Sequence, residues 1–135
     1  MSLGRVLVVD DEADVRKMVR MTLTKAGYDV VEAENGEMAI AVIKSGDNAL
    51  MLDAVICDIY MPKMNGLEAI AYFRSQFPSL PVIVLTGQTD LQWAVSLFRQ
   101  GVVDYLIKPV EPEKLTAVVH KATREHVLFR DQFKT

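Results

Sequence analysis

The sequence predicts an α/β fold in which five parallel strands alternate with five helices. Short apolar runs rich in Val, Ile and Leu recur along the chain, and stretches of helical periodicity separate them. The runs are continuous, as expected for parallel strands covered on both faces. This alternation calls for helices on both sides of the sheet, joined by right-handed crossovers. At 135 residues the chain has the size of one domain.

Each element follows from its own residues. The run RVLVV predicts the first strand, and apolar residues three and four apart from Val15 to Ala26 predict a helix that Gly27 ends. Asn35 is suited to cap the second helix, and Pro78 closes the third. We expect strands at residues 5–9, 30–33, 54–57, 82–85 and 103–107. We expect helices at residues 15–26, 36–44, 67–77, 90–100 and from 113 onward.

The composition argues against several classes of function. Half of the residues are hydrophobic, 24% are charged and the net charge is −3, which gives no electrostatic attraction to nucleic acid or an anionic membrane. No apolar run approaches the roughly 18 residues of a membrane span, and no signal peptide is evident, so we expect a cytoplasmic protein. The single cysteine, Cys57, lies in an apolar run, and we expect a buried, inert thiol.

Polar residues end four of the five expected strands. Asp10 and Asp11 follow the first strand, Asp58 the third, Thr86 the fourth and Lys108 the fifth. Parallel strands bring these ends to one edge, where three crowded carboxylates would repel one another. An all-oxygen set of ligands favours Mg²⁺, while the lysine and the hydroxyl suit a phosphoryl group. The edge is therefore predicted to hold Mg²⁺ beside a phosphoryl group.

Each of these residues has a simpler interpretation when it is taken alone. Asp10 or Asp11 could cap the first helix, Thr86 could be a turn residue and Lys108 an exposed charge. Pro109 could simply end the fifth strand. The combination of all these residue types on one edge is what favours a site.

The motifs together resemble the receiver domain of two-component response regulators. They are VVDDE around Asp10 and Asp11, CDIYMPKMNG around Asp58, LTG at Thr86 and DYLIKP ending at Lys108 and Pro109. The resemblance covers residues 5–125, nearly the whole chain. It implies a flavodoxin-like (βα)5 doubly wound fold with a five-stranded parallel sheet of order 2-1-3-4-5.

The resemblance also implies the chemistry of the site. Asp58 matches the aspartate that accepts a phosphoryl group from the phosphohistidine of a histidine kinase or histidine phosphotransfer protein. Asp10 and Asp11 match the pair that holds Mg²⁺ together with Asp58 and a backbone carbonyl, here that of Tyr60. A carboxylate can form such a covalent acyl phosphate.

The residues of the last two strand ends match a conformational switch. In the family, the counterparts of Thr86 and Lys108 bind the phosphoryl oxygens, and the counterpart of Tyr105 turns inward when the threonine moves. The switch acts on the face made by the fourth helix, the fifth strand and the fifth helix. Gly87 departs from the commoner alanine, which should loosen the loop, and Gln88 borders the phosphoryl group together with Tyr60 and tunes its lifetime.

Two other functions compete with a signalling switch. A Mg²⁺-dependent phosphatase with an aspartate nucleophile needs a second carboxylate two residues on, where this chain has Tyr60. A nucleotide-binding protein of similar fold needs a glycine-rich phosphate loop after the first strand, where this chain has DDEAD. Both interpretations are therefore weaker than that of a switch that catalyses only its own phosphorylation and dephosphorylation.

The last helix is longer than a compact receiver needs. We expect residues 1–125 to form the receiver domain and residues 126–135 to continue the helix away from it. The spacing of four and three residues along the helix is that of a coiled-coil seam, formed by Leu115, Val119, Ala122, His126, Phe129 and Phe133. We expect the first half to pack on the domain, and the second half to lead to an output domain or to pair with a second copy. His120 and His126 are expected at the surface or in that interface.

Overall fold

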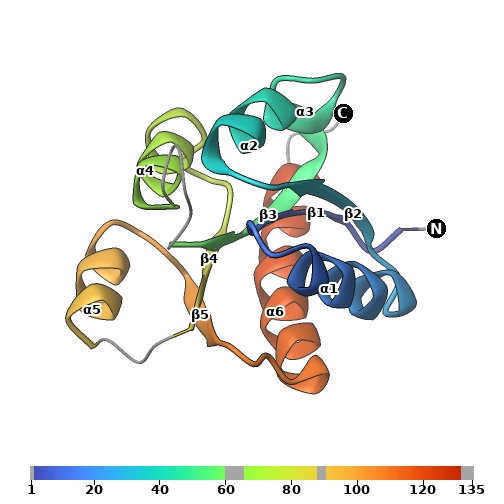
Figure 1. Ribbon diagram of the computed structural model, residues 1–135. Coiled ribbons are helices and arrows are strands. Elements are labelled where there is room, and N and C mark those ends of the chain that lie inside the picture. Colours follow the sequence, from blue (N-terminus) through green and yellow to red (C-terminus); the bar gives the residue numbers. More distant parts are fainter. Residues whose placement is uncertain (1, 60–65, 88–90, 132–135) are drawn as a thin grey trace.

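The computed structural model describes the backbone of residues 2–59, 66–87 and 91–131, and Figure 1 shows its three layers, a central sheet between two layers of helices. The sheet is parallel and has the order β2-β1-β3-β4-β5, which confirms the fold predicted from the sequence. Its strands are β1 (Arg5–Val9), β2 (Asp29–Ala33), β3 (Leu52–Asp58), β4 (Val82–Thr86) and β5 (Asp104–Ile107).

The helices cover both faces of the sheet. They are α1 (Ala13–Lys25), α2 (Gly36–Ile43), α3 (Asn48–Met51), α4 (Gly66–Gln76), α5 (Leu91–Arg99) and α6 (Pro112–Asp131). α1 and α6 lie on one face, and α2, α4 and α5 lie on the other (Figure 1). The predicted N-cap of α2 is present, because the Asn35 side chain accepts a hydrogen bond of 2.9 Å from the Met38 amide. No helix in the described ranges is long and apolar enough to cross a membrane.

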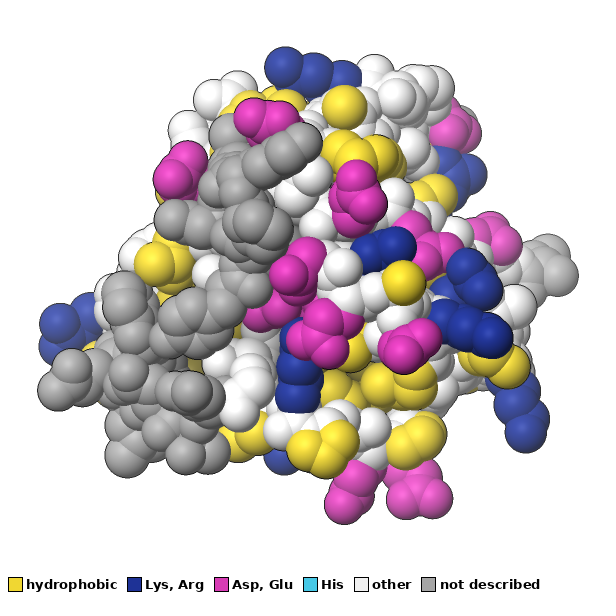
Figure 2. Space-filling model, in the orientation of Figure 1, with side chains coloured by type: hydrophobic (Ala, Val, Ile, Leu, Met, Phe, Trp, Pro, Cys, Tyr) yellow, Lys and Arg dark blue, Asp and Glu magenta, His cyan; other side chains and the backbone are white. Residues whose placement is uncertain are grey.

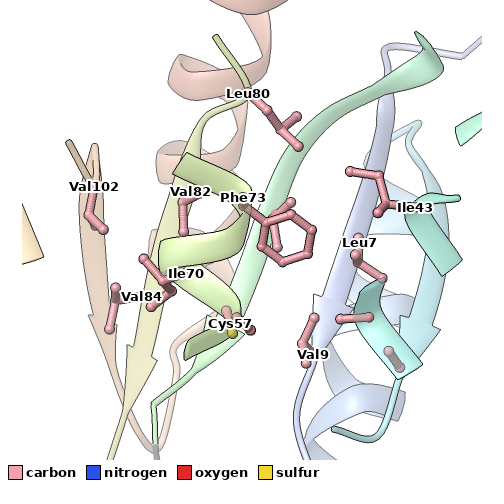
Figure 3. Close-up of a cluster of buried hydrophobic side chains, with 14 of the residues drawn as sticks. Leu7, Val9, Ile43, Cys57, Ile70, Phe73, Leu80, Val82, Val84 and Val102 are labelled. Carbon is pink, nitrogen blue, oxygen red and sulfur yellow. The ribbon is translucent and has the colours of Figure 1, made fainter. Parts of the chain in front are cut away.

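Two apolar cores fix the sheet between the helices. Alternate strand residues point to opposite faces, so Leu7 and Val9 face α2 and α4 while Val6 and Val8 face α1 and α6. In the first core, Phe73 of α4 is fully buried against the strands (Figure 3). This rigid support holds the carboxyl ends of the strands in a fixed relation to one another.

Two features of the region before β3 differ from the prediction. The short helix α3 was not expected, because four residues cannot display a helical period. β3 begins at Leu52 rather than at residue 54, and it includes the buried residue Asp53. A charged residue disfavours a strand interior, so the sequence alone predicts a later start. The pairing of β1 with β3 shifts register between Arg5 and Val6, so Asp53 is the extra residue of a β-bulge.

The last helix stays attached to the domain further than expected. Leu115, Val119 and Ala122 are buried against the sheet, as predicted. The helix continues to Asp131, and His126 is still in contact with the domain, because His126 Nδ1 lies 3.0 Å from Asp53 Oδ1 and its side chain is 10% exposed. The buried carboxylate holds the imidazole within the domain.

The other histidine of α6, His120, also has a partner inside the domain. Nδ1 of His120 lies 3.1 Å from the buried hydroxyl of Tyr28, which is also 3.1 Å from Thr123 Oγ1. His120 itself is exposed, as expected from the sequence. Side chains from Phe129 onward, including the predicted seam residues Phe129 and Phe133, lie outside the described part of the chain.

Candidate functional site

The carboxyl edge of the sheet gathers the polar residues predicted to form a site. Asp10 directly follows β1, Asp58 and Thr86 end β3 and β4, and Lys108 directly follows β5. The parallel register aligns these ends, for example by pairing Asp58 with Leu85 and Thr86 with Ile107. Figure 2 shows acidic side chains gathered beside a basic one near the middle of the face onto which the strands open.

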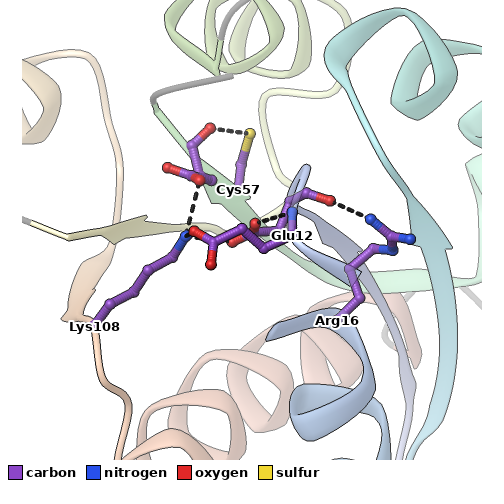
Figure 4. A network of polar contacts seen from close by, with 6 residues as sticks. Glu12, Arg16, Cys57 and Lys108 are labelled. Atoms are coloured by element: carbon purple, nitrogen blue, oxygen red, sulfur yellow. Dashed lines mark hydrogen bonds and ion pairs between the residues drawn. The ribbon is translucent and has the colours of Figure 1, made fainter. Parts of the chain in front are cut away.

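Lys108 lies at the centre of this cluster. Its Nζ atom is 2.8 Å from Asp10 Oδ2, 3.0 Å from Asp58 Oδ2 and 3.1 Å from Glu12 Oε1. Asp10 and Asp58 are buried, whereas the Glu12 side chain is 61% exposed. In Figure 4, Lys108 reaches from the end of β5 toward Glu12 on the loop between β1 and α1. The structure thus brings Asp10, Asp58 and Lys108 into direct contact.

The loop after β1 is held by its own polar groups. Asp10 Oδ1 accepts a hydrogen bond of 2.8 Å from the Glu12 amide, and Arg16 Nη1 donates one of 2.7 Å to the Asp10 carbonyl. The N-cap of α1 is Glu12, whose side chain makes no capping hydrogen bond. The alternative that Asp10 or Asp11 caps α1 is therefore wrong, and Asp10 instead points toward Lys108.

Burial and pairing compete in setting the charges at the site. Burial raises the pKa of Asp10, and the pairing with Lys108 and a hydrogen bond from the Glu12 amide offset this only in part. Burial alone would lower the pKa of Lys108, but the contacts of its ammonium with the carboxylates of Asp10, Asp58 and Glu12 outweigh burial, so the pKa lies above its ordinary value. Lys108 is therefore a fixed positive charge at neutral pH, and it compensates carboxylates that cannot reach bulk water.

The donor atoms of the site fit a hard divalent cation. Carboxylate oxygens of Asp10, Asp11, Glu12 and Asp58 lie within 4.8 Å of one another. The fully buried Asp10 Oδ2 atom has the charge of Lys108 nearby but receives no well-oriented hydrogen bond among the described residues. All-oxygen donors of this kind match Mg²⁺, which needs few protein ligands because it retains several waters.

The backbone of Asp58 is closely enclosed by its neighbours. A Cβ atom on Gly66 would collide with the Asp58 carbonyl oxygen, so the first residue of α4 must be glycine for the helix to approach β3 this closely. The Cys57 thiol lies 3.5 Å from the same carbonyl oxygen. Burial raises the pKa of this thiol, which agrees with the predicted inert cysteine.

Thr86 and Tyr105 lie on the side of the site formed by β4 and β5. Thr86 is 8% exposed, and its carbonyl accepts a hydrogen bond of 2.8 Å from the Lys108 amide. Tyr105 is half-buried, and its ring packs edge-to-face on Phe98 of α5 at a centroid distance of 6.0 Å. An aromatic contact thus joins β5 to α5 beside the polar edge.

Some predicted positions lie outside the described residues, and two contacts were not predicted. Tyr60 and Gln88 belong to the ranges that the structure does not describe. The contacts of Glu12 with Lys108 and of Arg16 with the Asp10 carbonyl were missed. The acidic run DDE shows that Glu12 lies next to the site, but the direction of its side chain depends on the loop conformation.

Comparison with known proteins identifies the family. A family model described as the response regulator receiver domain matches residues 6–120. The chemotaxis protein CheY of Thermotoga maritima is 35% identical over 121 residues, which cover 89% of this chain and 98% of CheY. The DNA-binding transcriptional regulator NtrC of Salmonella typhimurium is 37% identical over 122 residues, which cover 90% of this chain. The matched region spans only 25% of the length of NtrC.

Solved structures show the same relationship. A response regulator receiver domain protein from Clostridium thermocellum has a TM-score of 0.85 at 28% identity, covering 93% of this chain and 98% of that one. NtrX from Brucella abortus has a TM-score of 0.86 at 30% identity, covering 97% of this chain and 29% of NtrX. With its sheet order, its acidic edge and the match over residues 6–120, the chain belongs to the CheY-like response regulator receiver domains of two-component signal transduction.

Proposed function

We propose that this receiver domain is a phosphorylation-activated switch whose Asp58 accepts a phosphoryl group from phosphohistidine. The donor is a sensor histidine kinase or a histidine phosphotransfer protein, as the family match suggests. The observation that carries the proposal is the Lys108 ammonium, which lies within 3.0 Å of the buried carboxylates of both Asp10 and Asp58. A lysine in this position supplies positive charge where an anionic phosphoryl group must approach a carboxylate.

The proposed reaction is a single displacement at phosphorus. One carboxylate oxygen of Asp58 attacks the phosphorus atom, and the bond from phosphorus to the imidazole nitrogen breaks. The electron pair of that bond returns to the imidazole, and Asp58 becomes an acyl phosphate. Dephosphorylation transfers the same group to water, so the domain catalyses only its own modification and its reversal.

Asp10, Asp11 and Asp58 would hold Mg²⁺, with the Tyr60 carbonyl as a further expected ligand outside the described residues. When bound, the cation supplies positive charge to the phosphoryl oxygens. Asp10 and Asp11 follow β1 and Asp58 ends β3, so carboxylates from two strand ends would hold the cation together. Lys108 then contributes to phosphoryl binding rather than to neutralising carboxylates alone.

The switch would act through Thr86 and Tyr105 on the face made by α5, β5 and α6. A phosphoryl group brings a charge of about −1.5 to −2 at neutral pH, which Lys108 and the Thr86 hydroxyl would meet. Movement of Thr86 toward Asp58 makes room for the Tyr105 ring to turn inward. Because this ring packs on Phe98, its movement changes the contact between β5 and α5.

The helix beyond the domain gives the switch a route to a further partner. We propose that the end of α6 leads to an output domain or pairs with a second copy of the chain. Leu128 is 62% exposed near the end of this helix, and NtrC is about four times as long as the matched region. We expect no direct nucleic-acid binding by this domain, whose net charge is −3.

The test of the proposed function is phosphorylation by acetyl phosphate with Mg²⁺. We expect intact-mass spectrometry to detect one phosphoryl group on the wild-type protein, and hydroxylamine to remove it as it does an acyl phosphate. Asp58→Ala should remain unmodified, whereas Asp47→Asn, an exposed aspartate at the other end of the sheet, should react normally. Modification mapped to His120 or His126 would refute the assignment.

A further inference from the structure

The Lys108 ammonium donates hydrogen bonds to Glu12 and Asp58 and forms an ion pair with Asp10. An ammonium group has three N–H donors and no acceptor. The three neighbouring oxygens belong to Asp10 at 2.8 Å, Asp58 at 3.0 Å and Glu12 at 3.1 Å. A phosphoryl oxygen on Asp58 must therefore compete with these three oxygens for the lysine.

Burial decides which partner is released. The side chains of Asp10 and Asp58 are 0% and 4% exposed, so a carboxylate without the lysine would stay poorly hydrated. The Glu12 side chain is 61% exposed, and water can replace the lysine at little cost. Glu12 is thus the partner that leaves most readily.

The Glu12 side chain has no competing structural task at the start of α1. Glu12 occupies the N-cap position without making a side-chain capping hydrogen bond, and its amide is already bound by Asp10 Oδ1. The carboxylate instead extends toward Lys108 (Figure 4). The loop therefore presents a third, solvent-exposed carboxylate directly to the lysine.

We propose that Glu12 is a positioning residue that holds Lys108 in the unphosphorylated state and competes with the phosphoryl group for it. This inference rests on the proposed phosphorylation of Asp58. Because Glu12 and the phosphoryl group compete for the same ammonium, Glu12 lowers the affinity of the site for a phosphoryl group. The competition biases the switch toward its unphosphorylated form.

The test separates the contact of Glu12 with Lys108 from the charge of Glu12. Glu12→Gln keeps the size of the side chain and removes its charge. Glu12→Asp keeps the charge but is one methylene shorter, which takes it out of reach of Lys108. Glu37→Gln, an exposed residue in the first turn of α2, is the control for net charge.

The readouts are the affinity for beryllofluoride in saturating Mg²⁺, measured by calorimetry, and the ¹⁵Nζ NMR signal of Lys108. We expect Glu12→Gln and Glu12→Asp to bind beryllofluoride about two- to fivefold more tightly than wild type, the range of an exposed ion pair. Both should shift the Lys108 signal before beryllofluoride is added. Glu37→Gln should match wild type in both measurements.

Three outcomes would overturn the inference. Wild-type affinity in both Glu12 variants would mean that the contact has no energetic effect. Tighter binding by the Gln variant alone would mean that charge acts without the contact. Weaker binding of Mg²⁺ by both variants, measured without beryllofluoride, would make Glu12 a metal ligand instead. Failure of the wild-type protein to bind beryllofluoride would refute the proposed function itself, and Asp58→Ala gives the reference for that outcome.

Discussion

Asp53 and His126 join the amino end of β3 to α6, and breaking this contact should destabilise the domain. The Asp53 side chain is 1% exposed, and its Oδ2 atom accepts a hydrogen bond of 3.1 Å from the Arg5 amide. Its Oδ1 atom lies 3.0 Å from His126 Nδ1. Gly4 leaves room for this carboxylate, because a Cβ atom there would lie 2.9 Å from Oδ2. His126→Ala removes a partner that water cannot easily replace.

The expected cost follows from these contacts. A hydrogen bond to a charged group contributes about 1.5–3 kcal/mol to the free energy of unfolding. The imidazole, which is 10% exposed, adds about 1 kcal/mol of apolar burial. We therefore expect His126→Ala to lower the free energy of unfolding by about 3 kcal/mol, combining these two contributions. His126→Gln should recover part of the loss, since its amide can donate to Asp53.

Urea unfolding measures this loss, and a double-mutant cycle with Asp53→Asn measures the coupling. We expect a coupling energy of about 1–2 kcal/mol, as for residues that share a hydrogen bond. Hydrogen exchange should become faster in α6 after Ala122, where the helix loses its attachment to the sheet. A loss below about 0.5 kcal/mol, typical of surface substitutions, would show that the contact does not stabilise the domain.

Four further predictions concern the site, the switch, the tail and pH. Asp11→Asn should weaken Mg²⁺ binding and slow modification by acetyl phosphate, and wild-type modification in excess chelator would contradict a metal requirement. Beryllofluoride should shift NMR signals between Thr86 and Lys108 in the wild-type protein but not in Asp58→Ala, and unchanged wild-type signals would exclude the switch. If the tail pairs with a second copy, light scattering with beryllofluoride and Mg²⁺ should detect less self-association in a chain ending at Val127 than in the full chain. If both chains are monomeric and NMR shows a disordered tail, the tail is neither a pairing segment nor a helical linker. The hydrogen bond from Arg5 holds the pKa of Asp47 below its ordinary value of 3.8, so this group contributes stability above that pH and loses it as the pH falls through the lower folded value. Asp47→Asn should therefore flatten the loss of stability below pH 3.8 in acid-unfolding curves, and an unchanged curve would contradict the assignment.

The strands and the polar edge could be predicted because each depends on local sequence. A continuous apolar run such as β4 is visible as a strand, and parallel connections bring Asp10, Asp58 and Lys108 to one edge whatever the details of packing. The short helix α3 could not be predicted, since its four residues have no measurable period. The contact of Glu12 with Lys108 depends on the directions of two long side chains, and residue order alone does not determine these directions.

Asp53 shows a different limit, in which a correct local rule gives the wrong boundary. A charged residue disfavours a strand interior, so the sequence placed the start of β3 after Asp53. The strand includes it because the bulge, Gly4 and His126 together provide a site for a buried carboxylate. Two of these contributions come from distant parts of the chain, and only the folded structure brings them together.

The last helix shows why a seam pattern alone does not identify a partner. Spacings of four and three residues indicate one apolar stripe, but they do not say whether a sheet or a second chain covers it. Leu115, Val119 and Ala122 are covered by the domain's own sheet, and His126 is held there by Asp53. The first four positions of the expected seam are therefore used within the domain. Pairing with a second copy would have to depend on positions after His126, which is why the truncation test retains that residue.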